Sequence, residues 1–97
     1  MTIVSAVDGF DRLPGAELVA AGVDDLRAGT ESIAALLVSM GAPRLAALGL
    51  DLPEPLPSPE LRLYELLRRE DEDGAHSRYN ALVRELVSFE RAAECAS

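Results

Sequence analysis

Residues 30–43 read Thr-Glu-Ser-Ile-Ala-Ala-Leu-Leu-Val-Ser-Met-Gly-Ala-Pro, and this stretch decides the fold class. Thr30 is a good N-cap, and Pro43 cannot continue a helix. Between them, the large apolar side chains recur at the i, i+3, i+4, i+7 spacing of one helix face, and smaller ones extend the apolar surface almost all round: Ile33, Leu36, Leu37 and Met40, with Ala34, Ala35 and Val38. Because a helix that is apolar on nearly every side has to be covered by others, we expect a buried central helix.

Turn-forming residues on both sides of this central helix predict further helices. The preceding helix is expected to begin near Pro14 and Gly15 and to stop at Gly29. Gly22 lies on its apolar stripe and has no side chain, which indicates that another helix approaches closely there. A short helix over residues 43–48 is expected to follow the central one.

The second half of the chain contains a proline-rich segment and two more predicted helices. Residues 50–59 hold four prolines and are therefore expected to be an extended connector over the core, with a docking motif for a proline-reading domain as the alternative. Ser58 and Pro59 provide an N-cap and a first-turn proline for the next helix. After an acidic turn at 70–74, a long helix over about 75–95 is expected to span the domain.

These elements predict an all-α fold, a compact array or bundle of four to five helices with an extended proline-rich strap. A chain of 97 residues has the size of one domain, so we expect a single helical domain over 1–97. Residues 1–13 carry a short alternating run without a partner strand, and we interpret them as an extended N-terminal arm.

Charge and cysteine content exclude several function classes. The formal net charge is −8, and all nine basic residues are arginine. An acidic surface repels phosphate backbones, so a nucleic-acid partner is not expected. Cys95 is the only cysteine, which favours a reducing, cytoplasmic setting. The longest apolar run, residues 33–38, is too short to span a bilayer, so no membrane association is expected.

Cofactor and metal sites are not expected either. The glycines do not form a phosphate-cradling loop pattern. The acids at 70–73 offer oxygen ligands, but four consecutive carboxylates lack the alternating spacing of a calcium-binding loop. A solvated turn is the better interpretation.

The leading functional hypothesis is a non-enzymatic interaction protein, of the adaptor or regulatory kind, that binds a partner protein or itself as a homo-oligomer, most simply a homodimer. The last helix is the expected interface, through four side chains that could equally belong to the core: Leu82, Val83, Leu86 and Phe89.

The alternative hypothesis is an enzyme centred on the densest polar cluster, Arg69, His76, Arg78 and Tyr79. His76 is the only histidine, and its ordinary pKa lies near neutrality. Arg69 precedes it with six residues between them, a spacing that resembles the Arg-to-His pattern of helical ribonucleases of the HEPN type. This resemblance implies RNA cleavage or phosphoryl transfer, with both groups beside the scissile phosphate.

Overall fold

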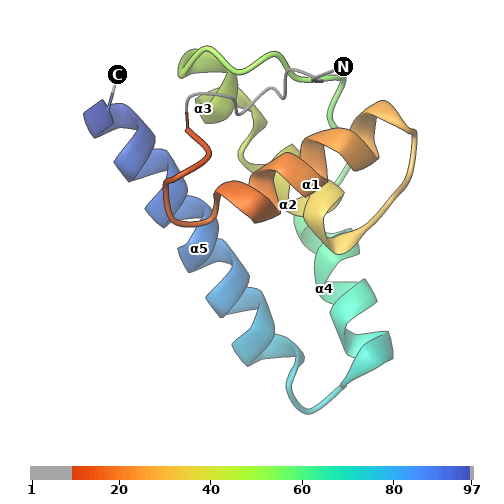
Figure 1. Ribbon diagram of the computed structural model, residues 1–97. Coiled ribbons are helices and arrows are strands. Elements are labelled where there is room, and N and C mark those ends of the chain that lie inside the picture. Colours follow the sequence, from red (N-terminus) through yellow and green to blue (C-terminus); the bar gives the residue numbers. More distant parts are fainter. Residues whose placement is uncertain (1–9, 97) are drawn as a thin grey trace.

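The computed structural model describes residues 10–96. This range contains five helices and no strands (Figure 1). This confirms the predicted all-α array. The helices are α1 (Ala16–Arg27), α2 (Ile33–Met40), α3 (Ala42–Ala47), α4 (Pro59–Glu70) and α5 (Ala75–Ala96).

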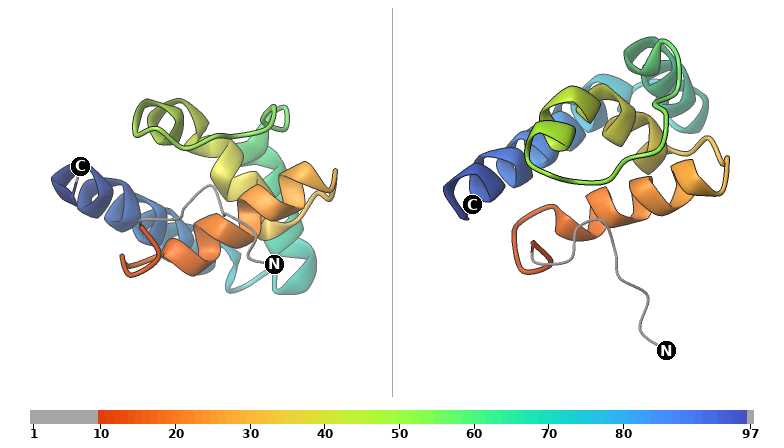
Figure 2. Two further views of the ribbon diagram at one scale, coloured as in Figure 1. Left: turned by 45° about the horizontal axis from the view of Figure 1, so that its top comes forward. Right: turned by 90° about the horizontal axis from the view of Figure 1, so that it is seen from above.

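The centre of the array is α2, as its apolar sequence predicted. Ala35, Leu36, Leu37 and Val38 are all completely buried. The helix packs against α1, α4, α5 and α3, so every side of it is covered by another part of the chain. Figure 2 shows α1 packed across one side of it.

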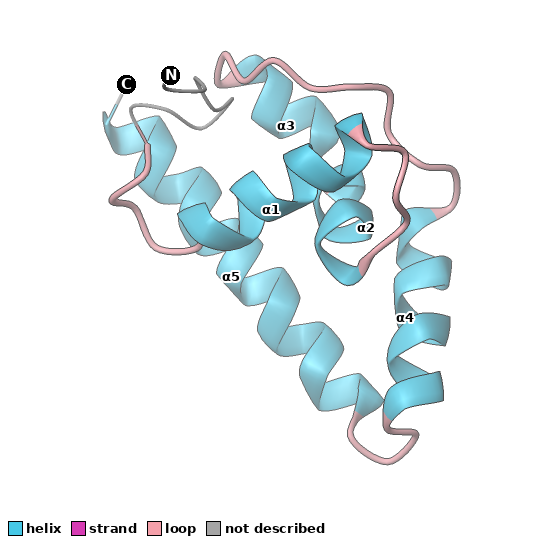
Figure 3. Ribbon diagram, turned by 45° about the vertical axis from the view of Figure 1, so that its right-hand side comes forward, coloured by secondary structure: helices cyan, strands magenta, loops and turns pink. Residues whose placement is uncertain are grey.

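The two long helices of the second half form a V. The turn at residues 71–74 joins α4 to α5, and the helices diverge from it, with α1 and α2 lying across the open end (Figure 3). At 22 residues, α5 is about 33 Å long. That is most of the molecule's longest dimension of 39 Å, so α5 extends along most of the molecule.

The start of α2 differs from the sequence prediction. The N-cap is Ser32, whose Oγ accepts a hydrogen bond from the Ala35 amide at 3.0 Å, whereas Thr30 is exposed and precedes the helix. Ser32 Oγ also donates to Asp25 Oδ2 at 2.6 Å. This contact with α1 holds Ser32 in place. Local sequence preferences could not predict it, because Asp25 belongs to a different helix.

Ser32→Ala is expected to lower the free energy of unfolding by about 1 kcal/mol, because an amide of the first turn loses its acceptor. Thr30→Ala serves as the matched control and should change it by less than about 0.5 kcal/mol, since Thr30 makes no cap. Urea denaturation followed by circular dichroism measures both. A larger loss at Thr30 than at Ser32 would contradict the observed cap.

Residues 50–58 of the predicted proline-rich connector lie outside the helices and are fastened to the core, whereas Pro59 is the first residue of α4. Leu50 is buried, and Leu52 and Leu56 are half-buried against the core. The amide of Leu56 donates to Ser39 Oγ at 3.0 Å, which attaches the segment to α2. The residues between α3 and α4 therefore cover part of the core, and we refer to residues 50–57 as the strap.

The predicted N-terminal arm is described only from Phe10 onward, and residues 1–9 lie outside the described part. Residues 10–13 form a turn closed by a 3.1 Å hydrogen bond from the Leu13 amide to the Phe10 carbonyl, so this part of the predicted arm is not extended. The Phe10 ring meets the Phe89 ring edge to face at 6.1 Å. This aromatic contact explains why the chain folds back onto α5.

Candidate functional site

The four apolar residues predicted as an interface on α5 divide into two groups. Phe89 is completely buried and Leu86 is 4% exposed, so both are core residues that a partner cannot reach in the folded chain. Leu82 and Val83 are half-buried and pack against the same core. The helical repeat was predicted correctly. However, its apolar side faces other helices of the same chain, and these four side chains do not form an exposed strip.

The polar cluster predicted for the alternative enzyme is spread over the α4–α5 turn. His76 is exposed in the first turn of α5, with its Nε2 3.3 Å from Asn80 Nδ2. Arg78 pairs with Glu70 at 2.8 Å between Nη1 and Oε1. Neither side chain is enclosed, and the guanidinium of Arg78 is occupied by a carboxylate of its own chain.

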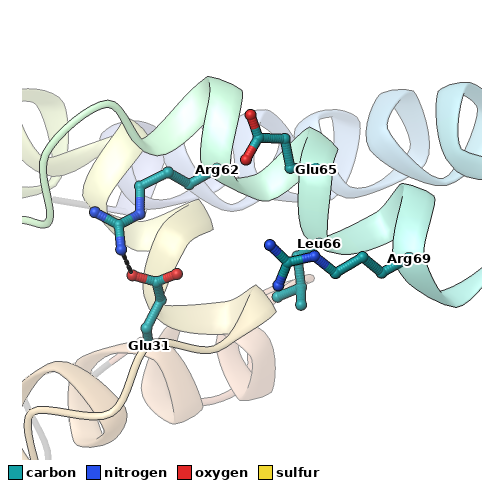
Figure 4. A pocket seen from close by; sticks show the side chains of 5 residues that line it. All are labelled: Glu31, Arg62, Glu65, Leu66 and Arg69. Atoms are coloured by element: carbon teal, nitrogen blue, oxygen red, sulfur yellow. Dashed lines mark hydrogen bonds and ion pairs between the residues drawn. The ribbon is translucent and has the colours of Figure 1, made fainter.

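Arg69 lines a different part of the surface. Together with Leu66 and Glu65 it borders a hollow of about 300 Å³ between α4 and the start of α2. Figure 4 shows Arg62 and Glu31 reaching toward each other across this hollow, where they form an ion pair. His76, Arg78 and Tyr79 do not line it. The structure therefore does not place Arg69 and His76 in one site.

Tyr79 belongs to the packing seam between α4 and α5. Its ring meets the Tyr64 ring edge to face at 5.8 Å. Burial, and secondarily the charge of Glu60, raises the pKa of Tyr79. The phenol is therefore protonated at neutral pH, which suits a packing role better than that of a nucleophile.

The acidic turn uses its carboxylates internally. Glu72 lies 3.4 Å from Arg68 in an ion pair, and Asp71 Oδ1 accepts a hydrogen bond from the Gly74 amide at 3.1 Å. Across residues 10–96, no three His, Cys, Asp or Glu side chains gather in a way that could hold a metal ion.

A buried carboxyl group on α5 is the feature that our sequence reasoning did not select. Glu90 is only 4% exposed and borders a hollow of about 330 Å³, which we call the Glu90 hollow. Burial raises the pKa of Glu90, nearby Arg44 opposes this rise, and Glu94 adds to it. The sequence did hold a signal, because Glu90 is the one acid that interrupts the apolar repeat of the last helix.

A second hollow, of about 380 Å³, lies between α3 and the strap, and we call it the strap hollow. Pro43 borders both hollows, so the two adjoin at the start of α3. One lining residue of the strap hollow, Glu54, is charged, and the others are apolar: Ala42, Pro43, Ala46, Leu52, Pro53 and Pro55.

Comparisons with known proteins add no functional information. No family model, no curated protein and no solved structure matches the chain. Among the helices of residues 10–96, none combines the length and the apolar character needed to cross a membrane.

Proposed function

We propose that this protein is a non-enzymatic interaction protein of the adaptor or regulatory kind, and that it associates with a second copy of itself through the strap hollow. The observation that carries the proposal is the mainly apolar lining of this hollow. Pro43 and Ala46 are exposed on α3, and Leu52 and Pro53 of the strap are half-buried beside them. Adjoining apolar side chains on a surface are typical of contact sites.

The position of the strap supports the same proposal. It is attached to α2 through Leu56 and to α1 through Arg27, whose Nη2 donates to the Asp51 carbonyl at 3.2 Å. A loop attached at both points presents its apolar side chains in a fixed arrangement. Less conformational freedom is then lost on binding than with a free loop.

Ala46→Glu is expected to weaken self-association at least about tenfold, which corresponds to about 1.4 kcal/mol, because it places a charge in an apolar contact. Ala47→Glu is the matched control, since Ala47 is also exposed on α3 but does not line the strap hollow. Light scattering after size exclusion measures both over a range of concentrations. Reducing buffer prevents crosslinking through the exposed Cys95.

Two results would contradict this proposal. The first is a wild-type protein that stays monomeric at every concentration. The second is an equal weakening by both substitutions, which would indicate a general effect of added negative charge on a chain of net charge −8.

The alternative, an RNA-cleaving protein centred on Arg69 and His76, receives less support from the geometry. Arg69 lines a hollow that His76 does not border. Cleavage of RNA by the wild-type protein, lost in His76→Ala with the fold intact, would favour it over the interaction proposal.

A further inference from the structure

Glu90 is largely buried, and its carboxyl group borders the Glu90 hollow. Its side chain makes no hydrogen bond and no ion pair with any residue in the described range 10–96, although the residue is only 4% exposed. The charge of Arg44 lowers the pKa of Glu90, but the Nε of Arg44 lies 2.9 Å from Glu94 Oε1 in an ion pair. No side-chain oxygen or nitrogen in residues 10–96 is both fully buried and without a hydrogen-bond partner, so the Glu90 carboxylate is reached from the hollow, and a positive charge there would be attracted to it.

Gly41 makes room for this carboxyl group at the junction of α2 and α3. A Cβ atom at Gly41 would lie 2.9 Å from Glu90 Oε2 and 3.1 Å from Leu86 Cδ2. The carboxylate therefore sits directly over the glycine backbone at the edge of the hollow.

The remaining walls of the Glu90 hollow combine apolar surface with charged residues of both signs. Met40, Pro43 and Val83 provide apolar contacts, and Glu60 adds a second carboxylate. Arg44 also lines the hollow, and its charge lowers the pKa of Glu90, although its Nε is paired with Glu94; the lining therefore carries two carboxylates and one guanidinium. A hollow of about 330 Å³ is within the size range of small-molecule sites.

We propose that the Glu90 hollow binds a small aliphatic ligand that carries one protonated amine, with the ammonium group at the Glu90 carboxylate and the alkyl part against Met40, Pro43 and Val83. This proposal stands independently of the proposed self-association. The two rest on different hollows, and the substitutions that test them are different.

The test is a titration with n-butylammonium, followed by amide chemical shifts of the isotope-labelled full chain. The wild-type protein is expected to show saturable shifts at Gly41, Val83 and Leu86. Glu90→Gln should weaken the apparent affinity at least about tenfold, because the counter-charge is lost. Glu65→Gln is the matched control: it also removes one carboxylate, but outside this hollow, and should leave the affinity unchanged.

A second variant keeps the test decisive if Glu90→Gln fails to fold. Arg44→Gln removes the cation that competes for Glu90 and should raise the affinity for n-butylammonium severalfold. A purely structural role of these residues does not predict opposite effects from the two substitutions.

Three results would overturn the proposal. The first is the absence of saturation at about 50 mM, where a site with a Kd of about 1 mM would be filled. The second is equal binding by wild type and Glu90→Gln. The third is equal binding of neutral 1-butanol, which would show that the hollow accepts apolar molecules without recognising charge.

Discussion

Phe89→Ala is expected to lower the free energy of unfolding by about 3–5 kcal/mol. The ring is completely buried and contacts Phe10 edge to face at 6.1 Å. Gly15 closes over it so tightly that a Cβ atom there would lie 3.2 Å from Phe89 Cβ. Removal of the ring leaves a cavity between α5 and the segment leading into α1. Because domains of this size are stable by only about 5–15 kcal/mol, a large part of the stability should be lost.

Urea denaturation monitored by circular dichroism measures this loss. Ser88→Ala is the matched control, since Ser88 is the exposed neighbour of Phe89 on α5, and it should change the free energy of unfolding by less than about 0.5 kcal/mol. Phe89→Glu should unfold the chain. A Phe89→Glu variant that stayed folded, with only its oligomeric state altered, would contradict the burial and restore Phe89 as an interface residue.

Phe89 also shows what helical periodicity can and cannot predict. The spacing of apolar residues correctly predicted a long helix over about 75–95, close to the observed Ala75–Ala96. Spacing identifies an apolar stripe, but a stripe that faces other helices of the same chain has the same pattern as one that faces a partner. The central position of α2 was predictable because its residues are apolar on nearly every side, which leaves no face for solvent.

The candidate sites depended on contacts between distant residues, and so they were less predictable than the helices. Arg69 and His76 are close in the sequence, but Arg69 lies in the last turn of α4 and His76 in the first turn of α5. Arg69 borders a hollow beside α2 that His76 does not line. Glu90 was visible only as a break in an apolar repeat. Its chemical environment comes from Gly41 and Arg44, about fifty positions earlier in the chain, and no local pattern contains them.

Gly22→Ala is expected to lower the free energy of unfolding by at least about 2 kcal/mol, a net figure in which overpacking outweighs the gain in helix propensity. Gly22 lies on α1 where α2 crosses it, which confirms the close approach expected from the sequence. A Cβ atom at this position would lie 2.3 Å from the Ala34 carbonyl oxygen and 2.4 Å from Val38 Cγ2. The carbonyl belongs to the backbone of the central helix, so it cannot move aside without moving α2.

Whether Gly22→Ala raises or lowers the free energy of unfolding distinguishes close helix packing from helix propensity. At an open helical position, replacing glycine by alanine stabilises the helix by about 1 kcal/mol. Ala21→Gly, at the exposed neighbouring position on α1, measures that intrinsic difference in the same helix and should cost about 1 kcal/mol. If Gly22→Ala instead raised the denaturation midpoint, α1 and α2 could not be packed as closely as the structure shows. A lowered midpoint would show that the packing of these two helices, and not helix propensity, requires a glycine at this position.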